Sequence, residues 1–177
     1  MIWFKTDGTP LDGDGGVSAA DATNIIVNLT TKQTITKDVS GSNRQRMNFD
    51  NVIKDKRSEW SASTFRFSPL VPSGKTYTYD ANVFLSFQDA FWSTGVRIDI
   101  GIWLNGPSTI LFNRFGWTSS GGAGGATRRD VISFQATIGQ YFEFFCLHQN
   151  TTDAALQPGA FGSTLGIKKI AEREVIE

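Results

Sequence analysis

The chain has 177 residues, of which 17 are basic and 17 acidic, so its formal net charge is zero, and 40% of the residues are hydrophobic. This length suits one domain with an extension, the apolar content argues against disorder, and the lack of surplus positive charge argues against nucleic acid as a partner. One cysteine, Cys146, and one histidine, His148, exclude an intrachain disulfide and any site that needs two imidazoles.

The sequence also indicates where the protein is made and which fold class it has. No apolar stretch approaches the roughly 18 residues that a membrane helix needs, and the first seven residues lack the basic and apolar regions of a signal peptide. We therefore expect a protein made in a cytoplasm, with no membrane partner. The 14 Phe, 5 Trp and 18 Gly favour pleated strands joined by tight turns, which predicts an all-β fold.

The beginning of the chain differs from the rest. Residues 6–16 hold four Gly, three Asp and one Pro, which is loop composition. Residues 19–29 fit either a short helix or an extended segment. We interpret residues 1–45 as an arm that packs on another protein. A single domain is then expected over residues 46–171, followed by a charged tail over residues 172–177.

Strand signals follow this arm. Residues 47–53 form a short, partly apolar run, and residues 64–67 alternate between polar and apolar side chains. A stretch with two prolines and a glycine, residues 69–74, marks a turn. Residues 77–87 are aromatic and long enough for a complete strand. We expect strands over residues 47–53, 64–67 and 77–87.

The strongest strand signal spans residues 96–104, where apolar side chains occupy every second position. They are Val96, Ile98, Ile100, Ile102 and Leu104. Period two predicts one buried strand face. Asn105-Gly106 follows, and both residues tolerate the positive φ of a type I′ hairpin turn, although Pro107 favours a slightly longer connection. The return strand is expected over residues 110–117.

The second half of the chain continues the pattern. Residues 118–127 contain only Ser, Gly and Ala between two threonines, which predicts a flexible loop. Strands are expected over residues 131–138 and 163–170. Residues 141–149 are apolar on both faces, so this strand should be buried on both faces, by a second layer or by another subunit. About eight to ten short strands and the lack of a repeat predict a sandwich or a jelly roll.

Several groups of residues, taken in chain order, resemble one family. They are Phe49-Asp50-Asn51-Val52-Ile53 with Trp60, Phe65 and Phe67; Pro72, Gly74, Tyr77 and Tyr79; Leu104-Asn105-Gly106; Phe134 to Phe142 with Gln135 and Gly139; and Ser163, Leu165 and Gly166. Their order over residues 48–170 resembles the globular head of the complement q component and the tumour-necrosis-factor-like jelly rolls. The resemblance implies an antiparallel jelly-roll sandwich of about ten strands. It also implies a homotrimer with aromatic side chains on its axis. Tyr79, Phe134, Phe142 and Phe144 are the candidates for that trimer interface.

Vertebrate members of this family are secreted, often with a collagen stalk, whereas bacteriophage virions use similar trimeric jelly rolls as decoration proteins and fibres. We therefore expect a non-enzymatic structural protein at the virion surface, of the capsid decoration (cement) or head-fibre type. Residues 1–45 would bind the major capsid protein or another virion protein. Deleting residues 1–30 is expected to leave a soluble trimer that no longer binds this partner.

The alternative is a receptor- or glycan-binding tip of a tail fibre that contacts a host surface glycan. Trp92, Arg128 and Arg129 are the candidate ligand contacts, because aromatic faces stack on sugars and basic loops meet acidic groups.

Catalysis and metal binding find little support in the sequence. Cys146 and His148 share a strand face and could form a nucleophile and base, but a core thiol and an end-of-strand imidazole that faces the polar loop at Gln149-Asn150 are expected instead. Asp12, Asp14 and Asp21 partly match a calcium loop, and a solvated turn is expected there because Pro10 occupies the first ligand position. We expect no catalytic residue, no metal and no cofactor.

Overall fold

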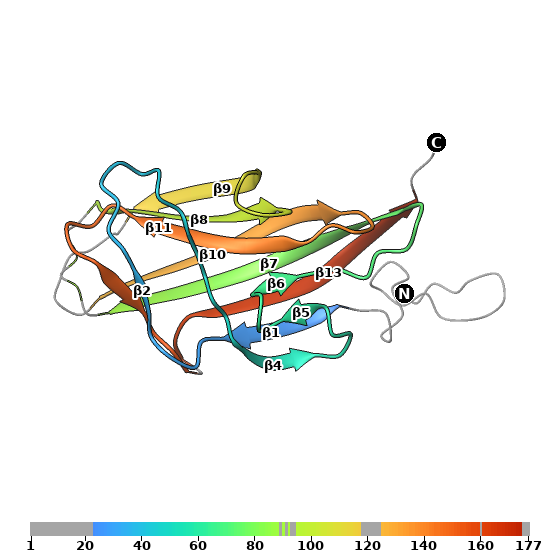
Figure 1. The fold of residues 1–177 in the computed structure, drawn as a ribbon, viewed down its shortest axis with the longest axis horizontal. Helices are drawn as coiled ribbons and strands as arrows, with labels where there is room; N and C mark the ends of the chain where they lie inside the picture. Colours follow the sequence, from blue (N-terminus) through green and yellow to red (C-terminus); the bar gives the residue numbers. More distant parts are fainter. Residues whose placement is uncertain are drawn as a thin grey trace, which may run out of the picture.

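The computed structural model describes residues 23–88, 90, 92, 95–117, 125–159 and 161–174, and every regular element in them is a strand (Figure 1). A seven-stranded sheet contains β1 (Asn24–Asn28), β2 (Gln33–Ile35), β4 (Asn51–Asp55), β7 (Lys75–Gln88), β10 (Ala126–Ala136), β12 (Ala154–Leu156) and β13 (Thr164–Glu174). A six-stranded sheet contains β3 (Gln45–Arg46), β5 (Trp60–Ser61), β6 (Arg66–Phe67), β8 (Arg97–Leu104), β9 (Ile110–Trp117) and β11 (Phe142–His148).

The strand pairs are nested along the chain. β8 pairs with β9, β7 with β10, β6 with β11 and β1 with β13, and every pair is antiparallel. This nesting is a long hairpin rolled into two layers, with successive pairs in alternate sheets, and it is the topology of a jelly roll. The predicted all-β jelly-roll sandwich is confirmed. The strand number reaches thirteen because several short pairings of two or three residues count as strands.

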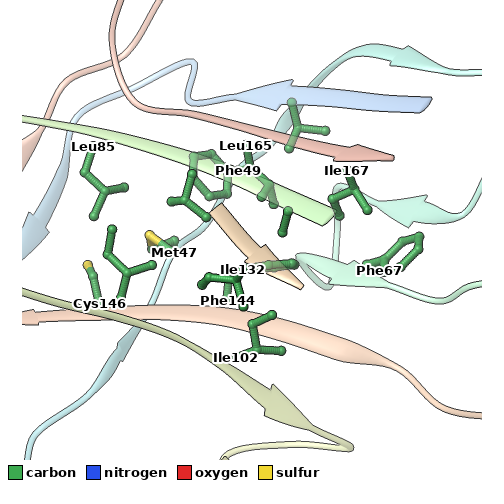
Figure 2. Packing of buried hydrophobic residues seen from close by; sticks show 14 of the residues in the cluster. Met47, Phe49, Phe67, Leu85, Ile102, Ile132, Phe144, Cys146, Leu165 and Ile167 are labelled. Atoms are coloured by element: carbon green, nitrogen blue, oxygen red, sulfur yellow. The ribbon is translucent and has the colours of Figure 1, made fainter. Parts of the chain in front are cut away.

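Side-chain alternation decides which faces meet. In β7 the odd-numbered residues from Tyr77 to Phe87 are buried and the even-numbered residues lie toward the outside. In β8, Ile98, Ile100 and Ile102 point into the core, as the period-two pattern predicts. Figure 2 shows how inward side chains from both layers interdigitate. Phe49, Phe67, Leu85, Phe144 and Ile167 belong to this single cluster.

The turn after β8 is the hairpin connection that the sequence predicts. Asn105 and Gly106 have φ values of 54° and 108°, in the left-handed region that these two residue types tolerate. The Leu104 N–H donates to the Thr109 carbonyl at 2.9 Å, so the connection is longer than two residues, as expected from Pro107.

The predicted boundaries of the arm and the tail need correction. β1 lies inside the seven-stranded sheet, between β13 and β4, and β2 and β3 also belong to the sandwich. Ile25 and Val27 of β1 are buried, but a run this short between polar residues carries a weak strand signal. The domain therefore begins at or before Thr23, and residues 1–22 of the predicted arm lie outside the described residues. At the other end, β13 extends to Glu174 into the predicted tail, and residues 175–177 lie outside the description.

The sandwich has two distinct ends. β1 begins and β13 finishes at the same end, because the two strands are antiparallel neighbours (Figure 1). β7, β9 and β11 finish at the opposite end (Figure 1). The predicted flexible loop falls on residues 118–127, of which 118–124 lie outside the described residues. In the part of the chain that the structure describes, no helix has the length and apolar character to span a membrane.

Candidate functional site

The cysteine and the histidine are core residues. Cys146 and His148 lie two positions apart on β11, face the same side and are fully buried. Burial raises the pKa of the Cys146 thiol, so the sulfur keeps its proton at neutral pH and is a poor nucleophile.

Both ring nitrogens of His148 are engaged within the chain. Nε2 donates to the Ile35 carbonyl at 2.9 Å, and Nδ1 accepts from the Asn150 N–H at 3.3 Å, which fixes the neutral tautomer. The rings of Phe87 and Trp92 pack on the imidazole with centroid distances of 5.7 and 5.3 Å. Burial lowers the pKa of His148. The imidazole links β2 to β11 and has no exposed surface with which to reach a substrate.

The four side chains predicted for the trimer axis lie in the core of one chain. Tyr79, Phe134, Phe142 and Phe144 are at most 5% exposed. Tyr79 stacks on Phe134 at 5.7 Å, and Phe134 lies 4.7 Å from Phe142. Their aromatic surface is therefore consumed by contact between the two layers, and these residues have no surface to offer a neighbouring subunit. Sequence alone cannot separate packing in the core from contact between subunits, because both need an apolar strand face.

The second face of β11 is covered by the same chain. Phe145 lies on Gly101, where a Cβ atom would approach the Phe145 ring to 2.2 Å, and the Trp103 ring is 4.8 Å from it. The guanidinium carbon of Arg44 lies 5.7 Å from the centre of the same Phe145 ring. A strand that is apolar on both faces is thus buried here without another subunit.

The three predicted ligand contacts separate in the structure. Trp92 is fully buried against Phe87 and His148, so it cannot stack on a sugar. The Arg128 guanidinium binds the carboxylate of Asp130, on the same strand, at 2.5 Å. Arg129 remains exposed, and its Nε donates to Asn82 Oδ1 at 3.3 Å. Of the three, Arg129 alone remains available to a partner.

Arg129 belongs to an open hollow on the outer face of the seven-stranded sheet. The hollow measures about 360 Å³ and is lined by Ile26, Asn82, Phe84, Arg129, Thr164, Leu165 and Gly166. Gly166 lies directly between Ile26 of β1 and Asn82 of β7 in the strand register. A Cβ at Gly166 would meet no atom closer than 3.8 Å, so the missing side chain creates this depression.

Two cross-strand rows define what we call the hollowed face. The first row is Ile26, Gly166, Asn82 and Val131, and the second is Asn28, Thr164, Phe84 and Arg129. Ile26 and Val131 are 37% and 46% exposed, and Phe84 is half-buried. Arg129 is the one charged side chain in these two rows, and Lys54 of β4 lies beside Ile26 where the first row continues onto β4. Depletion of charge and exposed apolar groups are features of the centre of protein interfaces.

Sequence reasoning found Arg129 but missed its neighbours. The alternation in residues 77–87 does place Phe84 on the face opposite Tyr79, but the aromatic character of the whole run hides it. Nothing local to Gly166 indicates that it lies between Ile26 and Asn82, because that depends on which strands pair.

The buried acids of the described chain have structural partners. Glu143 binds Arg46 and Arg66, Asp99 binds Arg97, Asp130 binds Arg114 and Arg128, Glu59 accepts from Thr23 and Leu70, and Asp38 accepts from Ser40 and Asn43. Over the described residues, no group of three His, Cys, Asp or Glu side chains could hold a metal ion. The loop with Asp12, Asp14 and Asp21 that was considered for calcium lies outside those residues.

Comparison with known proteins gives a likeness in fold. No family model and no curated protein matches the chain. The globular domain of zebrafish complement 1qA protein is similar with a TM-score of 0.45 and 9% identity, over 85% of this chain and 99% of that one. The Eiger TNF of S. frugiperda is similar with a TM-score of 0.47 and 11% identity, over 86% of this chain and 94% of that one.

Proposed function

We propose that this protein is a non-enzymatic structural protein of a bacteriophage virion, of the capsid decoration or head-fibre type. In this proposal its sandwich associates with copies of itself through the hollowed face. The observation that carries self-association is that face: a broad sheet surface with Ile26, Phe84 and Val131 at least partly exposed and one charged side chain in its two central rows. The motif resemblance over residues 48–170 supports three copies.

The two ends of the sandwich support separate roles, attachment at one end and exposure to the outside at the other. Thr23, where the arm meets the domain, is held at one end: its hydroxyl donates to Glu59 at 2.7 Å, and its carbonyl accepts from the Lys169 N–H at 3.2 Å. An arm that leaves from this end can bind a capsid or another virion protein while the opposite end points outward. Several copies of the arm on one assembly would strengthen attachment through multivalency.

Self-association is tested by placing a charge on the hollowed face. In Ile26→Lys and Val131→Lys, a buried lysine would have to lose its hydration at the interface, so we expect the assembly to dissociate into folded monomers. Val39→Lys is the matched control, because Val39 is exposed in the loop between β2 and β3 and lies off this face. Sedimentation velocity gives the mass and circular dichroism checks the fold. A wild-type chain that remains a monomer at high concentration would overturn the proposal.

A further inference from the structure

The outer face of the six-stranded sheet carries three arginines that lie on aromatic rings. The guanidinium carbon of Arg66 is 4.2 Å from the centre of the Tyr141 ring, that of Arg46 is 5.2 Å from Phe65, and that of Arg44 is 5.7 Å from Phe145. We call these six residues the arginine–aromatic cluster. It lies on the layer opposite the hollowed face.

One buried carboxylate orders two of the three arginines. Glu143 is almost completely buried, and its Oε1 accepts from Arg46 Nη1 at 2.9 Å and from Arg66 Nε at 3.2 Å. Arg46 also donates from Nε to Asn48 at 3.3 Å. Both side chains nevertheless remain 39% and 38% exposed, so part of each guanidinium faces solvent.

The cluster carries an excess of positive charge. The cluster holds three guanidinium groups and one carboxylate, that of Glu143, which pairs with Arg46 and Arg66, so two positive charges remain. Arg44 has no carboxylate partner among the described residues, and its Nη1 donates to the Ser42 carbonyl at 3.5 Å. The next ion pair on this face, Arg97 with Asp99 at 2.6 Å, adds no net charge. Asp38 is turned into its own loop, where it accepts from Ser40 and Asn43.

Ordered guanidinium groups favour recognition of an oxyanion that can accept two parallel hydrogen bonds. A guanidinium presents a fork of donors to a carboxylate or a sulfate, and a side chain already held by a ring loses less entropy on binding. The half-buried rings of Phe65 and Tyr141 add apolar surface beside these donors. The combination fits a ligand with both an apolar ring face and an acidic group.

Two other classes of anionic partner fit less well. Nucleic acid binding normally uses many phosphate contacts, and three guanidiniums on a chain of zero net charge are few. An extended acidic peptide is commonly bound by main-chain hydrogen bonds at a sheet edge. Glu143 and Phe145 lie on β11, which pairs with β8 on one side and with β3 and β6 on the other, so at this position the sheet offers side chains and no free edge.

We propose that the arginine–aromatic cluster binds acidic glycans, polysaccharides that carry carboxylate or sulfate groups. This activity does not depend on self-association, which uses the opposite layer.

Binding is tested with the full chain and defined polymers. Calorimetry with dextran sulfate and with polygalacturonate is expected to show binding that weakens as salt is added, whereas neutral dextran should not bind. The tighter of the two acidic polymers identifies sulfate or carboxylate as the preferred group. The proposal is overturned if neither acidic polymer binds, or if polyglutamate or single-stranded DNA binds as tightly as the better glycan.

Two variants locate the binding surface. Arg44→Gln removes a stacked cation without leaving a buried acid unpaired, and it should weaken binding about tenfold, the value of one charge-assisted hydrogen bond. Arg66→Lys keeps the charge opposite Glu143 but loses the planar group, and it should also weaken binding. Arg173→Gln, an exposed arginine on β13 of the other sheet, is the control with the same change in charge. Equal weakening by Arg44→Gln and Arg173→Gln would reduce the effect to net charge and refute the assignment. Sedimentation of the same samples separates this result from a failure of self-association.

Discussion

His148 illustrates how burial decides the role of a residue that sequence leaves open. A lone histidine two positions from a lone cysteine fits a catalytic pair, but the inner face of β11 places both in the core. The imidazole is neutral, donates to Ile35 and accepts from Asn150. Gly101 shows the same dependence, since it is required because the Phe145 ring occupies the space of its side chain. Each role comes from a neighbour distant in sequence.

The buried imidazole predicts a pH dependence of stability. Burial lowers the pKa of His148, so below the ordinary value of 6.5 the unfolded chain takes up a proton that the folded chain refuses. Stability is therefore lost as the pH falls from about 6.5 toward 5, by at most about 1.4 kcal/mol per pH unit for one proton. In His148→Gln the free energy of unfolding should change less over this interval. Denaturant unfolding at several pH values measures both slopes, and parallel slopes would contradict the prediction.

At the scale of elements, β9 and β10 meet where both sheets end. Asp130 of β10 binds Arg114 of β9 at 2.9 Å and Arg128 at 2.5 Å, and Arg114 also lies 3.5 Å from the Val131 carbonyl. Gly116 leaves space for the Arg128 guanidinium, which a Cβ atom would approach to 2.1 Å. These contacts join the two edge strands, and the Arg114 guanidinium occupies one carbonyl on the unpaired edge of β10, that of Val131. Charged side chains at a sheet edge disfavour pairing with another chain.

Removal of the Asp130 charge is expected to weaken this join. Asp130→Asn leaves two guanidinium groups without their carboxylate at a mostly buried position, so the free energy of unfolding should fall by about 1–3 kcal/mol. Asp80→Asn is the matched control, because Asp80 accepts one hydroxyl, from Ser133, on the outer face of β7, and its loss should cost about 0.5 kcal/mol or less. Urea unfolding compares the two variants. Equal losses of unfolding free energy in the two variants would show that the contacts of Asp130 stabilise the fold no more than a surface hydrogen bond does.

At the scale of the whole molecule, the jelly roll separates three surfaces. The hollowed face and the arginine–aromatic cluster occupy opposite layers, and the arm joins the domain at the end where β1 begins (Figure 1). The proposed self-association, the proposed glycan binding and the proposed attachment through the arm can therefore be tested one at a time. The buried acids of the described residues are held by internal partners.

The corrected domain boundary changes the truncation experiment. Deleting residues 1–30 removes β1, which pairs with β13 and β4, so that protein should fail to fold. Deleting residues 1–22 keeps Thr23 and its bonds to Glu59 and Lys169, and we expect the melting temperature and the oligomeric mass to remain unchanged. This shorter deletion should abolish binding to virions in a cosedimentation assay. Continued binding would show that attachment does not depend on these residues.

Local pattern determined the longer strands of this protein, because side-chain period, turn residues and β-propensity act over a few neighbouring positions. The strand over residues 96–104 and the Asn105-Gly106 turn followed from such signals, and the order of the motifs over residues 48–170 indicated the jelly-roll class. Tertiary pairing decided which apolar face became core, where Ile26, Gly166 and Asn82 met, and which arginines lay on which rings. A strand pattern states that a face is apolar, whereas the choice between core and interface depends on the layer that packs against it.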